Sequence, residues 1–294
     1  MKSFYRCRQY FLFLCLMIEL PFQAYADPPP APLPAQDSFL TLNNPMNSGF
    51  FAVFNSVLGA LNFYEQGRYG GLKIDLNEGI YFDPEKGSNW WGYFFEPIHL
   101  GNDSNEKYFF SLQDALHLTD SSFHLSRQRS FELIQRYVHL KPHIQKELES
   151  FIKTYFKKHF VIGVHHRGTD KKLETPIIPY EQTVLHLNAH IANLSEKTRK
   201  RLKIYVATDE QDFVDYMLKL YPSLLIYNDF KRSTNGEPIH YTTNLYSSNY
   251  QKGKEALLDC LLLSRCNLLL YPAAASLSLS ALKFNPNLPA ATTN

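Results

Sequence analysis

The C-terminal half of the chain alternates short apolar segments with longer helical ones, and this alternation restricts the possible folds more than any other feature. Four apolar segments are predicted as buried strands, at residues 160–164, 202–207, 224–227 and 268–271. Helices are predicted at residues 180–192, 210–220, 254–265 and 276–283, and a polar loop at 228–253. Strands and helices that alternate in this way predict an α/β fold with a doubly wound parallel sheet. Ligands of such sheets bind outside the carboxyl ends of the strands.

The N-terminal half has less regular patterning. It is predicted to hold a helix at 56–64, a strand at 72–76 and a helical stretch at 130–156 that is broken at Pro142. It is preceded by a linker at 27–36, where five prolines disfavour both helix and sheet. With 294 residues, the chain can form one large domain or two modest ones.

Residues 1–26 have the features of a secretory signal peptide. A basic start precedes an apolar run at 10–20, and small residues precede the expected cleavage point after Ala26. The apolar run contains Glu19 and is too short to span a bilayer, so no stable membrane span is expected. This predicts a secreted, periplasmic or secretory-lumen protein; the alternative is an uncleaved N-terminal anchor.

Charge and cysteine content exclude several classes of protein. Cleavage after Ala26 removes three basic residues and one acidic residue, which lowers the formal net charge from +2 to zero. No basic stripe remains, so nucleic acid is not expected as a partner. Only Cys260 and Cys266 stay in the mature chain, so a disulfide framework is not expected either.

The segment that follows the first predicted strand carries the strongest chemical signal. Residues 161–164 are mostly apolar and deliver His165, Arg167 and Asp170 to one polar turn at the strand end. Arg167 can hold a phosphate through two parallel N–H donors, and Gly168 allows a close approach of the backbone to a ligand. The alternative is a solvated loop with an Arg–Asp ion pair.

Two aspartates are candidates for ligand contacts. Asp209 ends the second predicted strand, where either it or Thr208 could also cap the helix that follows. Asp259 lies among apolar neighbours in a predicted helix, where a carboxylate is costly unless it has a partner. That partner could be a structural group of the protein or the hydrogen-bond donors of a nucleotide base.

The last predicted strand is followed by small residues that open a helix. Pro272, three alanines at 273–275 and Ser276 could expose N–H groups to an anion, or could form a plain turn in which Ser276 caps the helix.

The chain contains no Walker loop, no glycine-rich dinucleotide motif, no zinc-type cysteine pairs and no Asp-x-Asp metal–diphosphate motif. No metal site is predicted, so side chains and helix ends would have to neutralise a bound diphosphate, which makes Arg167 more important.

Three motifs in order resemble those of a known superfamily. Residues 163–171, which read Gly-Val-His-His-Arg-Gly-Thr-Asp-Lys, resemble the His-x-Arg signature of the superfamily of α-1,6-fucosyltransferases, nodulation fucosyltransferases and protein O-fucosyltransferases. The similarity continues through 205–209 and 258–266, and in the N-terminal half through 49–60, a segment that includes Asn55. Two positions depart from the expected pattern: Gly168 stands where the α-1,6 enzymes have a second arginine, and the alanines at 273–275 replace more polar residues.

The resemblance implies a two-lobed glycosyltransferase fold of the B type. In such a fold the N-terminal lobe, expected at 37–157, would face the acceptor, and the C-terminal lobe, expected at 158–294, would bind a nucleotide sugar, GDP-fucose. The enzymes transfer with inversion and need no metal or other cofactor. The expected partners are thus the nucleotide-sugar donor and a glycan or glycoprotein acceptor.

Carried over position by position, the resemblance suggests roles for eight residues. The matched residues are Arg167 for the β-phosphate, His165 near the nucleotide, Asp259 for guanine, Ser276 near the diphosphate, Asp209 and Asn55 as further substrate-binding candidates, and Glu174 or Asp170 as the catalytic base. The sequence therefore predicts a fucosyltransferase. A non-catalytic glycan- or nucleotide-sugar-binding protein, and a transferase that uses another nucleotide sugar, remain as alternatives.

Overall fold

The structure is a computed structural model. It describes residues 38–43, 48–102, 107–109, 125–169, 178–234 and 248–294, together with positions 236, 239 and 246. The predicted signal peptide and linker, and the candidate bases Asp170 and Glu174, lie outside the described residues.

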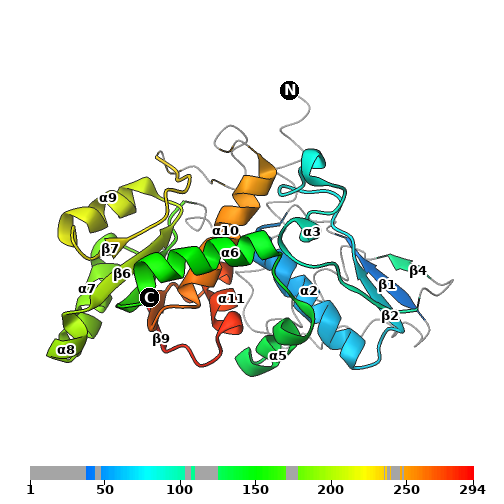
Figure 1. Ribbon diagram of the computed structural model, residues 1–294, viewed down its shortest axis with the longest axis horizontal. Helices are drawn as coiled ribbons and strands as arrows, with labels where there is room; N and C mark the ends of the chain where they lie inside the picture. Colours follow the sequence, from blue (N-terminus) through cyan, green and yellow to red (C-terminus); the bar gives the residue numbers. More distant parts are fainter. Residues whose placement is uncertain are drawn as a thin grey trace, which may run out of the picture. The chain divides into compact units, whose positions relative to one another are not determined.

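The described secondary-structure elements belong to two sheets and the helices around them (Figure 1). In chain order they are β1 (Phe39–Leu42), α2 (Phe50–Glu65), β2 (Gly71–Ile74), η1 (Pro84–Lys86), α3 (Trp91–Phe94), β3 (His99–Gly101), β4 (Lys107–Phe109), α5 (Arg127–Tyr137), α6 (Pro142–Phe151), η2 (Ile152–Phe156), β5 (Phe160–His166), α7 (Tyr180–Ala192), α8 (Glu196–Arg199), β6 (Leu202–Thr208), α9 (Gln211–Leu220), β7 (Leu225–Ile226), α10 (Asn249–Leu263), β8 (Leu268–Tyr271), α11 (Ser276–Phe284) and β9 (Ala290–Thr292).

The C-terminal elements form the parallel sheet that the sequence predicts. Its five strands have the order β7-β6-β5-β8-β9, and every neighbouring pair is parallel. From β5 the chain moves outward through β6 and β7, then crosses back to the other side of β5 for β8 and β9. The direction of winding thus reverses between β5 and β8, which is where open α/β sheets bind their ligands.

Helices cover both faces of this sheet, so the predicted double winding is confirmed. Alternate strand residues such as Ile162 and Ile204 pack with buried residues of α7 and α9, the α9 face (Figure 1). The intervening residues, such as Val161 and Tyr205, pack with α10 and α11, the α10 face. Gly163 allows α10 to come close, because a Cβ atom there would lie 2.9 Å from the Sγ atom of Cys266.

The N-terminal elements form a second, mixed sheet of order β3-β2-β1-β4. Strand β1 runs parallel to β2 and β4, whereas β2 and β3 are antiparallel. Helix α2 is mostly buried and packs with aromatic side chains that include Trp90, Trp91 and Phe94. Because α2, α10 and α11 share one hydrophobic core, the boundary between 157 and 158 stays a prediction.

Several predicted element ends need correction. Helix α10 begins at Asn249, with the Ser248 hydroxyl accepting a hydrogen bond from the Gln251 N–H, so the predicted loop at 228–253 ends too late. Helix α2 begins at Phe50 rather than at 56, and β9 was not predicted. The break at Pro142 is confirmed, because α5 ends before it and α6 begins with it. No described helix combines the length and apolarity needed to cross a membrane.

Candidate active site

A cavity lies beyond the carboxyl ends of β5 and β6. It contains about 560 Å³ of space, part of it open to solvent. Its walls come from the ends of these strands, the segment after β7, α10 and α11. The lining residues are His165, Arg167, Ala207, Thr208, Asp209, Phe230, Lys231, Ile239, Tyr246, Lys252, Glu255, Ala256, Asp259 and Leu277.

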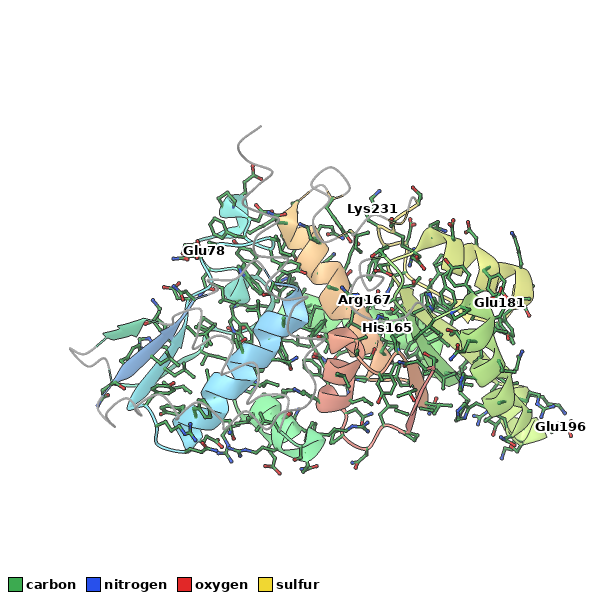
Figure 2. The ribbon with its side chains drawn as sticks, turned by 180° about the vertical axis from the view of Figure 1, so that it is seen from behind. Glu78, His165, Arg167, Glu181, Glu196 and Lys231 are labelled. Atoms are coloured by element: carbon green, nitrogen blue, oxygen red, sulfur yellow. The ribbon has the colours of Figure 1, made fainter. Side chains whose placement is uncertain are left out.

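The structure brings four of the predicted site residues to this one cavity. Arg167, His165, Asp209 and Asp259 line it, although they come from three separate motifs. In Figure 2, His165 and Arg167 lie close together near the ribbon of α10.

Two predicted site residues lie elsewhere. Ser276 is the first residue of α11 and does not line the cavity, although its neighbour Leu277 does. Asn55 is 1% exposed in α2, and its Oδ1 atom accepts a hydrogen bond from Lys283 Nζ at 2.8 Å. The structure thus gives Asn55 a partner in the core rather than a place at the cavity.

Asp209 shapes the turn that carries Arg167. Its Oδ1 atom accepts from the Gly168 N–H at 3.2 Å, and its Oδ2 atom accepts from Thr169 Oγ1 at 2.6 Å. The prediction that Asp209 caps the next helix is wrong, because the N-cap position of α9 is Glu210. The carboxylate instead joins the segments that follow β5 and β6, both of which contribute residues to the cavity lining.

The glycine at 168 has a steric reason. A Cβ atom at this position would lie 2.1 Å from Oε2 of Glu210. That carboxylate also accepts from the Tyr180 hydroxyl at 3.1 Å, so it is held in place. A long side chain at 168 would have to displace the Glu210 carboxylate.

Asp259 has one carboxylate oxygen fixed by the protein. Its Oδ1 atom accepts from the Tyr205 hydroxyl at 2.6 Å and from Asn228 Nδ2 at 3.3 Å. Its Oδ2 atom has no hydrogen-bond partner among the described residues. Both sequence interpretations are therefore compatible, since one oxygen is structural and the other is left for a ligand of the cavity.

Burial raises the pKa of Asp259 to about 6. The hydrogen bond from Tyr205 and the positive charge of Arg232 act in the opposite direction and favour the carboxylate. The group is therefore largely ionised at neutral pH but close to titration. An ionised Oδ2 atom can accept hydrogen bonds only, so its natural partner is a pair of N–H donors.

His165 is 4% exposed, and its Nδ1 atom is hydrogen-bonded to Ser278 Oγ on α11. Burial, followed by the nearby charges of Arg167 and His166, lowers the pKa of His165 to about 3. The ring is therefore neutral at physiological pH. A neutral imidazole carries one ring proton, so Nε2 can be either an N–H donor or an acceptor, depending on the tautomer.

Sequence analysis missed the residues of α10 that accompany Asp259. Lys252, Glu255, Ala256 and Asp259 all line the cavity, and their spacing places them on one helical face. This signal was available in the sequence, but the late predicted start of α10 left Lys252 in a loop. Burial lowers the pKa of Lys252 and raises that of Glu255.

The segment after β7 supplies the opposite wall. Arg232 is 6% exposed and donates to the carbonyl oxygens of Phe230 at 3.1 Å and Asn228 at 2.6 Å. The Lys231 N–H donates to Oε2 of Glu255 at 3.0 Å. These bonds hold Phe230 and Lys231 against the cavity. Within the described ranges, no three His, Cys, Asp or Glu side chains come together as a metal site.

A protein-family model identifies the family of this chain. The model described as Alpha-(1,6)-fucosyltransferase N- and catalytic domains matches residues 115–272, more than half of the chain. The chain belongs to this family. The predicted superfamily and the predicted glycosyltransferase class are thereby confirmed.

Solved structures share the fold at low sequence identity. NodZ α-1,6-fucosyltransferase soaked with GDP-fucose matches with a TM-score of 0.60 and 18% identity, over 85% of this chain and 93% of NodZ. Fucosyltransferase NodZ from Bradyrhizobium gives a TM-score of 0.57 and 17% identity, over 83% and 92%. POFUT1 in complex with GDP gives 0.52 and 11%, over 89% and 99%. The predicted α/β glycosyltransferase fold of the B type is confirmed.

Proposed function

We propose that the cavity binds GDP-fucose and that the protein transfers the fucose to a hydroxyl group of a glycan or protein. One observation carries the proposal: Arg167 and Asp259, from motifs far apart in sequence, line the same cavity. A guanidinium suits a diphosphate, and a carboxylate with one unengaged oxygen suits the N–H edge of a base. The shared fold of NodZ and of POFUT1, solved with GDP-fucose and GDP respectively, supports the same donor.

The cavity chemistry favours guanine among the common bases. Guanine carries N–H donors at both N1 and N2, which a carboxylate can accept together, whereas adenine has an acceptor at N1. Phe230, Ile239 and Leu277 supply apolar surface for the faces of the base. Asp259 is held in register by Tyr205 and Asn228, so the accepting oxygen needs little reorganisation when a base enters.

The proposed reaction is a single displacement at C1 of fucose. The acceptor oxygen forms a bond to C1 as the bond from C1 to the β-phosphate oxygen of GDP breaks, with attack from the opposite face and therefore inversion. Arg167 stabilises the negative charge that develops on the departing phosphate, without requiring a metal. The acceptor proton passes to a carboxylate, for which Asp170 and Glu174 are the candidates.

A nucleotide panel tests the donor. Melting temperatures are measured with GDP, ADP, UDP and CDP at equal concentrations, and only GDP is expected to give a large increase. Equal responses to all four would contradict the proposal. Transfer and hydrolysis are then measured with labelled GDP-fucose and a set of glycan and peptide acceptors. Binding of GDP-fucose without either reaction would favour the non-catalytic alternative.

We also propose that the protein acts outside the cytoplasm. Support comes from the sequence of residues 1–26 alone, which has a basic start, an apolar run and small residues before Ala26. Mass spectrometry of the protein from its native host is expected to find a mature N-terminus at Asp27. A mature chain that keeps residues 1–26 would contradict cleavage.

A further inference from the structure

A single hydrogen bond connects the cavity to the interior of α11. It joins His165 Nδ1 at the end of β5 to Ser278 Oγ in the first half of the helix. Ser278 is 0% exposed and His165 is 4% exposed, so water cannot replace either partner. Both groups can donate or accept, and the position of the protons decides what His165 shows to the cavity.

The hydroxyl proton of Ser278 has one acceptor within reach. Ser278 Oγ makes no other hydrogen bond to the described residues. If the imidazole donated through Nδ1, the buried hydroxyl proton would have no acceptor, and an unsatisfied buried donor is costly. If the hydroxyl donates instead, Nδ1 accepts and the single ring proton of neutral His165 lies on Nε2. The second arrangement leaves no buried donor unpaired.

The second ring nitrogen, Nε2, can present this proton to the cavity. It makes no hydrogen bond to the described residues and keeps some solvent-accessible surface. The His165 side chain lines the cavity together with Arg167. An Nε2–H group would add a neutral donor beside the guanidinium.

We propose that Ser278 is a positioning residue that holds His165 in the Nε2–H tautomer, so that the imidazole donates a hydrogen bond to an oxygen of the bound nucleoside diphosphate. This rests on the proposed function for the identity of the ligand, but not for the tautomer. It also assigns His165 a donor role and excludes it as the base that accepts the acceptor proton. A tautomer with a free Nε2 lone pair would instead repel a phosphate oxygen.

The neighbouring histidine shows that this argument is specific. His166 Nδ1 lies 3.4 Å from Thr183 Oγ1, and its Nε2 atom is buried without a hydrogen-bond partner. The hydrogen bonds around His166 therefore do not favour either neutral tautomer of its ring. His166 provides an internal reference in any experiment that observes all histidines.

The test is nitrogen NMR of the full chain labelled with ¹⁵N-histidine. The His165 signals are assigned by their loss in His165→Gln. In the wild type we expect a protonated Nε2 and an unprotonated, hydrogen-bonded Nδ1 that stay constant between pH 5 and 8. Ser278→Ala should give a mixture of tautomers and weaken GDP binding about five- to tenfold, as expected for loss of one ordered hydrogen bond. Ser278→Thr, which keeps the hydroxyl, should retain the wild-type His165 signals.

The outcomes separate this inference from the proposed function. A protonated Nδ1 in the wild type overturns the inference without any variant, even if Ser278→Ala fails to fold. Unchanged signals and GDP affinity in a folded Ser278→Ala protein also overturn it. If the wild type shows the Nε2–H tautomer but GDP does not bind, the tautomer assignment stands and the proposed donor fails.

Discussion

His165 and His166 are adjacent on β5, yet their surroundings differ almost completely. On the α10 face, His165 lines a cavity together with Arg167, Asp209 and Asp259. On the α9 face, His166 is stacked on Phe213 with ring centroids 4.2 Å apart and lies edge-on to Tyr180 at 5.0 Å. Its Nε2 atom is 3.4 Å from Glu210 Oε2, without hydrogen-bond geometry.

The difference arises from the helices that cover each face rather than from the strand. The α9 helix presents Phe213, Val214 and Met217, all 0% exposed, which close the sheet surface. The cavity-facing side of α10 carries Lys252, Glu255 and Asp259, and these residues line the cavity together with the end of β5. Polar residues at a strand end thus line a cavity only where the opposing helix leaves room.

The largest expected effect is at Arg167. Replacing it with alanine removes a charged, two-pronged contact on the α10 face, and GDP affinity should fall at least about 100-fold, since charge-assisted hydrogen bonds contribute about 1.5–3 kcal/mol each. Isothermal titration calorimetry measures the loss. Arg167→Lys is the matched control: lysine keeps the charge but lacks the two parallel N–H donors, so GDP affinity of this variant should be intermediate. Equal affinity of Arg167→Ala and wild type would remove Arg167 from the site.

Asp259 should confer both base selectivity and pH dependence. Its pKa is raised to about 6, so guanosine affinity should weaken as the pH falls through 6 and the accepting carboxylate becomes protonated. Because the folded-state pKa lies above the usual value, the contribution of this group to the free energy of unfolding decreases as the pH rises from about 4 to about 6.

Asp259→Asn serves as the control for this titration. An amide has one accepting oxygen instead of two, so it cannot serve guanine together with the Tyr205 and Asn228 donors, and we expect guanosine affinity to fall about 10- to 100-fold and its pH dependence to flatten. Guanosine is used because it has no phosphate that titrates in this range. A variant that keeps the wild-type pH profile would show that another group titrates.

His166→Ala tests the closed side of the comparison. The substitution leaves a cavity against Phe213 and should lower the free energy of unfolding by about 2–4 kcal/mol, as for other large-to-small changes in cores. GDP affinity, measured at a temperature where the variant is folded, should change far less than in Arg167→Ala. A loss of affinity as large as that of Arg167→Ala would mean that the two faces are not independent.

The smallest effect is expected at Gly168. An added Cβ atom would force Glu210 away from Tyr180, and Gly168→Ala should cost about 1–2 kcal/mol of stability, as for other overpacking changes. In a Glu210→Ala background the same substitution should cost less, because the colliding carboxylate is absent. Denaturant unfolding of the wild type, the two single variants and the double variant gives the coupling energy. If the losses of stability in the single variants simply add in the double variant, the steric explanation is wrong.

Local patterns in the sequence were sufficient for much of the fold. Apolar runs predicted β5, β6, β7 and β8, because a strand buried on both faces needs apolar side chains along its whole length. The edge strand β9 escaped detection, since its sequence Ala-Ala-Thr carries little β-propensity and its pairing to β8 depends on the rest of the sheet. The start of α10 was missed because its first turn is polar: Asn249 and Lys252 there donate hydrogen bonds to the carbonyl oxygens of Phe82 and Ile80.

The sequence by itself determined the parallel α/β sheet and the delivery of His165 and Arg167 to one strand end, since both follow from short-range periodicity. Tertiary structure alone decided that Asp209 supports the β5 turn instead of capping α9, and that Asn55 meets Lys283 in the core. It also decided that the α10 face, and not the α9 face, opens into a site. These outcomes depend on side chains that approach from distant segments, so no local pattern could specify them.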